Sequence, residues 1–191
     1  MVILPAIPLV AMLAISVATL VRGSAIRRKT GDRAWAFASA KGVQRIAGSS
    51  FAISVTMLLA AAVFAARMEP GGLSLVATVT ALIGAAIVII AQVQMGRAWR
   101  VGVRAGDAPL FISHGLFRFS RNPIFVGMIL IGLGSALAAM TWWAWAALAI
   151  FTVSCGVQVR IEEAHLEASF GNAYRDFRAT VPRWLGPVGT R

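Results

Sequence analysis

The sequence predicts an all-α fold, a polytopic membrane bundle of about five transmembrane helices. Of its 191 residues, 59% are hydrophobic and only 13% are charged, and this balance is too apolar for a water-soluble domain. Five apolar stretches also reach or approach the roughly 17 to 25 residues with which a helix crosses a bilayer. Because no repeat or low-complexity tract divides them, we expect one compact bundle.

The five predicted spans are residues 2–21, 43–66, 73–95, 123–140 and 142–159. The first is predicted to be a retained anchor, because it lacks the basic segment that precedes the apolar run of a signal peptide. In the second, Gln44 and Arg45 place the first turns at the membrane interface. Between these two spans we predict a polar connection with a short interfacial helix through Trp35 and Phe37.

The formal net charge of +11 is distributed in a way that indicates membrane topology rather than nucleic-acid binding. Seventeen of the eighteen lysines and arginines lie within residues 22–45, 97–121 and 160–191, and Arg67 is the exception. Five spans put these three segments on one side, which the positive-inside rule makes the cytoplasm. We therefore predict a multi-pass protein of the cell (plasma or inner) membrane, with its N-terminus outside and its C-terminus cytoplasmic, in contact with anionic lipids.

A helix-start signal lies at the cytoplasmic boundary of the fourth span. The segment 118–127 reads Arg-Phe-Ser-Arg-Asn-Pro-Ile-Phe-Val-Gly. Pro123 disfavours helical conformation at Asn122 and fits the first helical turn itself, so Asn122 is predicted to be the N-cap. Free backbone N–H groups, the helix dipole and the side chains of Arg118 and Arg121 then predict an anion site.

The adjacent Glu162 and Glu163 form a second polar feature, beyond the fifth span. Neighbouring helical residues point about 100° apart, so we expect only one of the two to face inward, and Glu163 is the predicted one. Apolar residues at 166, 170, 174 and 177 recur at helical spacing, which predicts that this helix continues past the membrane. Its end or turn is expected near residues 181–183.

Other features favour structural roles over sites. Cys155 is the only cysteine and is expected to pack as a small apolar residue. His114 and His165 lack a second metal-type partner at helical spacing, so no metal site is predicted. Gly132 and Gly134 lie inside an apolar span and indicate close helix packing rather than a nucleotide-binding loop.

These motifs together resemble the superfamily of isoprenylcysteine carboxyl methyltransferases and phospholipid methyltransferases. The similarity is carried by Gly115-Leu116-Phe117-Arg118, by Arg121-Asn122-Pro123-Ile124-Phe125-Val126-Gly127, and downstream by the glutamate pair, Phe170-Gly171, Tyr174 and Val181-Pro182-Arg183. It covers about residues 92–185. The chain departs from the family's pattern at two positions, because Asn122 replaces a histidine and Phe125 a tyrosine. A general base at position 122 is therefore not expected.

The resemblance implies an integral membrane methyltransferase that uses S-adenosylmethionine. The implied cofactor-binding residues are Leu116, Phe117, Arg121, Asn122, Pro123, Phe125, Glu162, Glu163 and Tyr174. Apart from the resemblance, Arg118 and Arg160 are the predicted catalytic residues, because a planar guanidinium suits the orientation of an acceptor carboxylate. In-line methyl transfer requires alignment and a dry pocket more than acid–base chemistry.

The acceptor is expected to be a lipophilic small molecule or lipid, with an isoprenoid or fatty carboxylate as one option, and the active site is expected to face the cytoplasm. Residues 1–95 are predicted to carry the lipid-substrate side and residues 96–191 the methyltransferase core. Two alternatives remain open at this point: a membrane reductase of the NADPH-dependent sterol or steroid type, and a non-catalytic membrane scaffold. The sequence predicts no oligomeric state.

Overall fold

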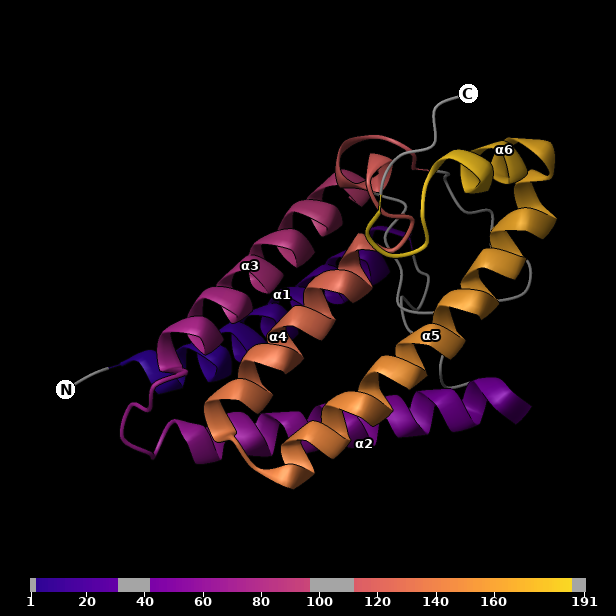
Figure 1. The fold of residues 1–191 in the computed structure, drawn as a ribbon. Coiled ribbons are helices and arrows are strands. Elements are labelled where there is room, and N and C mark those ends of the chain that lie inside the picture. The colour runs from indigo at the N-terminus through magenta and orange to yellow at the C-terminus, as the bar shows by residue number, and fades with distance from the viewer. Residues whose placement is uncertain (1–2, 31–41, 97–111, 187–191) are drawn as a thin grey trace.

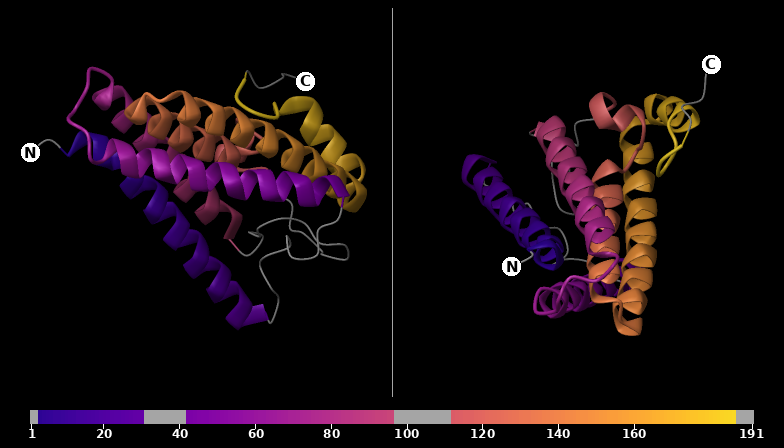
Figure 2. Two further views of the ribbon diagram at one scale, coloured as in Figure 1. Left: turned by 90° about the horizontal axis from the view of Figure 1, so that it is seen from below. Right: turned by 60° about the vertical axis from the view of Figure 1, so that its left-hand side comes forward.

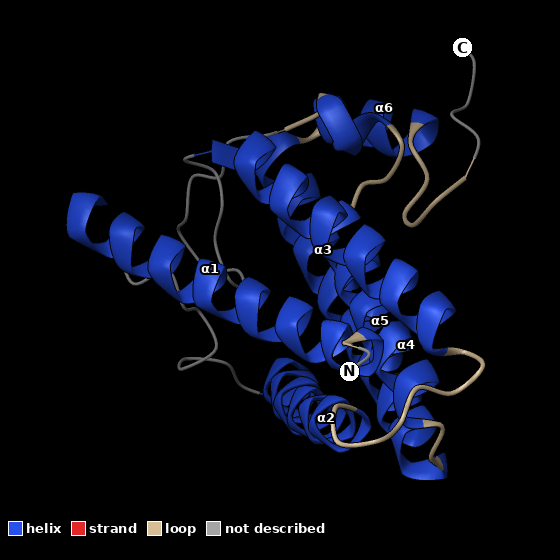
Figure 3. Ribbon diagram, turned by 90° about the vertical axis from the view of Figure 1, so that its left-hand side faces the viewer, coloured by secondary structure: helices blue, strands red, loops and turns tan. Residues whose placement is uncertain are grey.

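The computed structural model describes residues 3–30, 42–96 and 112–186, and all regular secondary structure within them is helical (Figures 1 and 3). The elements are η1 (Leu4–Ala6), α1 (Ile7–Thr30), α2 (Gly42–Ala65), α3 (Ser74–Met95), η4 (Gly115–Arg118), α4 (Pro123–Ala139), α5 (Trp142–Phe170) and α6 (Asn172–Thr180). The predicted all-α fold is therefore confirmed. The interfacial helix predicted through Trp35 and Phe37 lies outside the described residues.

Five of these helices are apolar along most of their length. Four are long enough to cross a membrane, namely Leu4–Ala25 at the start of α1, then α2, α3 and α5, and α4 is shorter with 17 residues. At 1.5 Å per residue α4 extends about 25 Å, near the lower limit for a bilayer core. Many large apolar side chains on these helices are exposed, as expected for surfaces that meet lipid tails. The chain is thus a multi-pass membrane protein.

The helices run in alternating directions, so that their polar ends collect at one end of the bundle. In Figure 1 the last turns of α3 and α5 and the first turn of α4 lie at the upper end, beside α6. The connection between α2 and α3 and the turn between α4 and α5 lie at the opposite end.

Hydrogen bonds hold α1 parallel to α3. Thr78 Oγ1 donates to the carbonyl of Leu4 at 2.9 Å, and Gln92 Nε2 donates to Thr19 Oγ1 at 3.2 Å. At the end of α3, Arg22 Nη2 of α1 donates to the carbonyl of Gly96 at 2.8 Å, where φ of the glycine is 51°. This last contact satisfies a carbonyl that the end of α3 leaves without an intrahelical partner.

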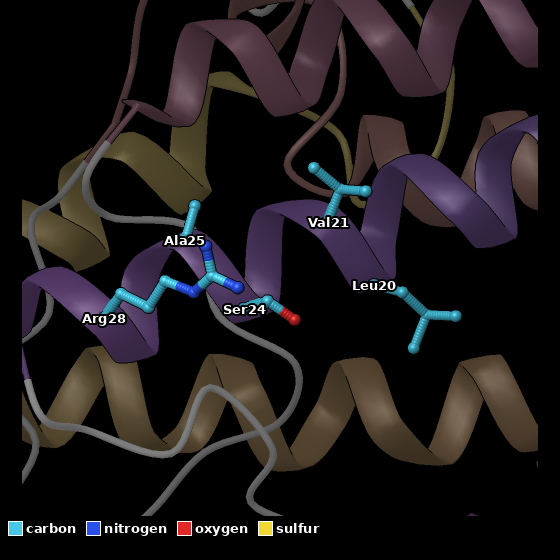
Figure 4. Close-up of a pocket in the computed structure, with 5 residues that line it drawn as sticks. All are labelled: Leu20, Val21, Ser24, Ala25 and Arg28. Carbon is cyan, nitrogen blue, oxygen red and sulfur yellow. The ribbon is translucent and has the colours of Figure 1, made fainter.

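The last turns of α1 stand apart from the other helices (Figure 2). A cavity of about 540 Å³ lies against it. Its described lining consists of Leu20, Val21, Ser24, Ala25 and Arg28 (Figure 4). Apolar groups therefore line most of this cavity, together with the hydroxyl of Ser24 and the guanidinium of Arg28.

The closest helix contact joins α3 and α4 through glycines. A Cβ atom built on Gly84 would lie 2.5 Å from the carbonyl oxygen of Gly127, and one on Gly134 would lie 2.7 Å from that of Ala77. Only residues without a side chain permit this approach. The predicted packing role of Gly132 and Gly134 is confirmed, since Gly132 meets Leu58 of α2 on another side of the helix.

The helix that follows the fifth span is interrupted, which corrects the continuous helix predicted from the apolar periodicity. α5 does extend beyond residue 159 to Phe170, but Gly171 adopts φ +54° and ends it. α6 then begins at Asn172 and ends at Thr180, close to the predicted turn. Gly171, with its left-handed φ, ends the helix at a position that the apolar periodicity does not mark.

Candidate active site

A buried carboxylate at the upper end of the bundle binds two arginines. Glu163 of α5 accepts hydrogen bonds from Arg121 Nε at 3.0 Å and from Arg183 Nη2 at 2.8 Å. Its side chain is 7% exposed, and those of Arg121 and Arg183 are 8% and 37% exposed. Hydrogen bonding to Glu163 raises the pKa of Arg183 above its ordinary value. We call Arg121, Asn122, Glu163 and Arg183 the clasp.

The clasp also fixes the chain that follows α6. Arg121 Nη1 donates to the carbonyls of Arg178 and Val181 at 2.9 and 2.8 Å, and the backbone N–H of Arg121 donates to the carbonyl of Pro182 at 3.0 Å. Asn122 Nδ2 donates to the carbonyl of Arg183 at 3.1 Å. The start of α4 therefore binds three successive carbonyls of residues 181–183.

The predicted anion site at the start of α4 does hold a carboxylate, but it is the chain's own. Arg121 directs Nε and Nη2 to Glu163 and Nη1 to backbone carbonyls, so its donors are largely satisfied within the protein. α4 does begin at Pro123, directly after Asn122. Asn122 therefore occupies the predicted N-cap position. The predicted capping hydrogen bond from its side chain is wrong, however, because the side-chain amide donates to the carbonyl of Arg183 and makes no hydrogen bond to the first turn of α4.

The two adjacent glutamates have different surroundings. Both oxygens of Glu163 bind arginine, whereas Glu162 Oε1 accepts a hydrogen bond from Gln158 Nε2 at 3.1 Å. Gln158 is buried at 3% exposure, and its Oε1 has no hydrogen-bond partner. The Nε2 atom of His165 is likewise buried without a partner. Glu163 is thus the inward member of the pair, as predicted, but its oxygens bind arginines, and the cofactor contact predicted for it stays a prediction.

Aromatic side chains lie close to the same face of α5. Phe125 of α4 and Trp184 both pack against a buried cluster of Leu58, Ala147, Phe151 and Cys155. The packing role predicted for Cys155 is therefore confirmed. Cys155 lies three residues before Gln158, so both occupy one side of α5. This side changes from apolar to polar as the helix approaches the end of the bundle.

The remaining predicted cofactor-binding residues lie on η4, at the start of α4 and on α6. Phe117 of η4 and Pro123 are buried, and the backbone N–H of Leu116 donates to Gln94 Oε1 at 2.8 Å. Tyr174 of α6 is 1% exposed, and burial raises the pKa of its hydroxyl to about 12, with a further contribution from the charge of Glu163.

Arg118 and Arg160, the predicted catalytic pair, are both exposed. Arg160 follows Gln158 by two residues, and two helical residues at that spacing point about 200° apart. It therefore projects from the side of α5 nearly opposite Gln158. Neither arginine belongs to the clasp.

Sequence reasoning did not select Arg183, Gln158 or Gln94 as site residues. Arg183 lies 20 residues from Glu163 with a helix break between them, so no helical spacing connects the two. Gln94 binds η4 at the end of α3, and its side chain fills the space beside Gly115, where a Cβ would lie 2.3 Å from it. For Gln158 a signal was present, because it is a polar residue inside an apolar helix and lies four residues before Glu162.

Comparison with known proteins assigns the chain to a family. A family model described as phospholipid methyltransferase matches residues 72–173, which is just over half of the chain and extends from the start of α3 into α6. No curated protein and no solved structure matches the chain. Members of this family transfer a methyl group from S-adenosylmethionine, which decides against the reductase and scaffold interpretations. The chain belongs to the phospholipid methyltransferase family and is an integral membrane methyltransferase that uses S-adenosylmethionine to methylate a lipid.

Proposed function

We propose that this protein methylates the polar end of a lipophilic acceptor at the cytoplasmic boundary of the cell membrane. The observation that carries the proposal is that buried charged and amide side chains gather at one end of the bundle, whereas the buried polar side chains of the described residues elsewhere are serines and threonines. The clasp, Gln158 and Glu162 all lie where α4 begins and the apolar part of α5 ends. Buried polar groups are costly beside lipid and commonly mark functional sites there.

The residues of this region fit S-adenosylmethionine. The cofactor carries an ammonium, a carboxylate, ribose hydroxyls and an adenine, and these groups need acceptors, donors and an apolar surface. Gln158 Oε1 is a buried acceptor without a partner, and Phe125 and Trp184 offer aromatic surface on the same side of the bundle. When bound, the cofactor would supply a methyl carbon for in-line attack by the acceptor, with the cationic sulfur as the leaving group, released as neutral S-adenosylhomocysteine.

The contribution of the chain itself to catalysis is positioning and exclusion of water. The clasp holds residues 181–183 against the start of α4, and this brings Trp184 onto the bundle. A wall held in place in this way would favour alignment of two reactants and help to exclude water. We propose that Arg121, Asn122 and Glu163 act through this wall rather than by contacting the cofactor.

Arg118 and Arg160 are proposed to bind the anionic part of the acceptor. Both are exposed cations at the polar end of the bundle, where a lipid headgroup would lie. The lipid chain is proposed to enter from the side, through the cavity beside α1, whose lining is mostly apolar. Residues 1–95 would then supply the lipid-substrate side and residues 96–191 the core that binds the cofactor.

A lipid methylation assay tests this function directly. Purified protein in nanodiscs, incubated with a total membrane-lipid extract and cofactor labelled in its methyl group, is expected to transfer label to the organic phase. Treatment with mild base then identifies the atom, because a carboxyl methyl ester loses the label and an N-methyl group keeps it. The Arg118→Ala and Arg160→Ala variants are expected to raise KM for the lipid. A folded, cofactor-binding protein that labels no lipid would contradict the proposal.

The proposed topology predicts which positions an impermeant thiol reagent can reach. In a Cys155→Ser background, Gly71→Cys between α2 and α3 is expected to react in intact cells, and Asp107→Cys and Thr190→Cys are expected to be protected. The basis is the charge bias of seventeen to one across the membrane. Permeabilised cells provide the control, since all three positions should then react. Fast labelling of Asp107→Cys in intact cells would reverse the orientation.

A further inference from the structure

The short helix η4 is held in place by a side chain from another helix. Gln94, near the end of α3, accepts a hydrogen bond at Oε1 from the backbone N–H of Leu116 at 2.8 Å. The first N–H groups of a helix have no partner within it, and His114, which precedes η4, supplies no side-chain cap. Gln94 therefore caps η4 from α3, and we call this contact the Gln94 cap.

The backbone at the start of η4 is shaped to receive the Gln94 side chain. Gly115 has a φ of +62°, which glycine adopts without strain. A Cβ at this position would lie 2.3 Å from Cδ of Gln94, so a side chain at position 115 would force the glutamine to move. Gly115 thus permits both the sharp entry into η4 and close packing of the amide against it.

The far end of η4 is fixed as well. The backbone N–H of Ser120 donates to the carbonyl of Leu116 at 3.2 Å, and Ser120 Oγ accepts a hydrogen bond from the backbone N–H of Asn122 at 3.0 Å. A single turn of 3-10 helix has little stability of its own, so its placement depends on such contacts. With both ends fixed, the rotation of η4 about its own axis is fixed too.

This rotation determines the direction of Arg118. Successive residues of a 3-10 helix, which has three residues per turn, point about 120° apart. Phe117 is buried, and Arg118, one step further along η4, is exposed. A rotation of η4 by one residue would exchange the two directions. The contacts that keep Phe117 inward therefore also keep the guanidinium outward.

We infer that Gln94 is a positioning residue for the lipid acceptor, because its cap on η4 directs the guanidinium of Arg118. This inference deepens the proposed function and rests on the role proposed there for Arg118, which is to bind the anionic part of the acceptor. Gln94 itself contacts no reactant and acts only through this arginine. Its loss should therefore weaken use of the lipid more than the chemical step.

Three substitutions separate this role from a structural one. Gln94→Met keeps the length of the side chain but removes the carbonyl oxygen, and Gln94→Glu keeps an acceptor at the same place. Gln92→Met is the matched control, because Gln92 lies on the same helix and its amide binds Thr19 of α1 instead of η4. Full-length proteins in nanodiscs are assayed with labelled S-adenosylmethionine and increasing fractions of the total membrane-lipid extract. Amide hydrogen exchange and melting temperatures are measured on the same samples.

Gln94→Met is expected to raise KM for the lipid extract about 5-fold with little change in kcat, and to speed amide exchange within residues 115–118. Gln94→Glu should restore both values, and Gln92→Met should change neither. In the double variant with Arg118→Ala, Gln94→Met should raise KM no further than Arg118→Ala does alone, since the cap acts through that arginine.

Two results would overturn the inference. One is a folded Gln94→Met protein with the wild-type KM, when Arg118→Ala has raised KM. The other is a double variant in which the two increases multiply, because Gln94 would then act independently of Arg118. A wild-type protein that labels no lipid would instead refute the proposed function and the inference with it, and faster exchange in Gln94→Met would then assign the glutamine a structural role only.

Discussion

Gly127→Ala is expected to lower the free energy of unfolding by about 3 kcal/mol or more, because it overfills the tightest helix contact in the bundle. The new Cβ would lie 2.6 Å from the carbonyl oxygen of Gly84 and 3.0 Å from the backbone nitrogen of Val88. Backbone atoms cannot turn away as a side chain can. α3 and α4 would have to separate, and the connection from Gln94 to η4 would be disturbed with them.

The matched control for this variant is Gly156→Ala, on α5. A Cβ at Gly156 has no atom within 4 Å, so alanine fits there and favours helix by up to about 1 kcal/mol. Thermal unfolding of both variants in the same detergent measures the difference. Melting temperatures that agree within error would show that the glycine contact between α3 and α4 does not stabilise the fold.

The apolar spans and the start of α4 were predictable because they depend on local sequence. Length and hydropathy identify the spans, and Pro123 marks the first turn of α4 whatever the rest of the chain does. The pairing of Gly84 with Gly127 was not predictable, since many small residues occur in these helices and none of them encodes its partner. Gly132 and Gly134 indicated close packing but not the helices they would meet.

The candidate site was predictable in its residue types and only partly in their roles. Arg121 and Glu163 were both identified as site residues, but each was assigned to a ligand instead of to the other. Their ion pair depends on how α4 and α5 are packed, which no spacing along the chain reveals. Arg183 could not be identified as a site residue for the same reason, because it lies beyond the helix break at Gly171 and no helical spacing relates it to Glu163. The side chain of Asn122 was expected to cap α4, but its amide donates a hydrogen bond to the carbonyl of Arg183 instead, a tertiary contact that the local sequence does not reveal.

Glu163→Gln is expected to destabilise the protein by about 3 to 5 kcal/mol, the range for removing one partner of a buried ion pair. Arg121 would remain as a charged side chain that is only 8% exposed, with its carboxylate gone. Arg183→Gln should cost less, because Arg183 is 37% exposed and water can replace part of its contact. Thermal unfolding of the three proteins gives the order, and a Glu163→Gln protein as stable as the wild type would show that the clasp contributes nothing.

The central claim is that two adjacent glutamates divide structure and ligand binding between them. The most direct measurement compares Glu162→Gln with Glu163→Gln, the same change at neighbouring positions, for melting temperature and for S-adenosylhomocysteine affinity. We predict that Glu162→Gln melts near the wild type and binds the ligand about 10-fold more weakly, whereas Glu163→Gln melts clearly lower. Wild-type affinity in a folded Glu162→Gln protein, together with a wild-type melting temperature for Glu163→Gln, would contradict the claim.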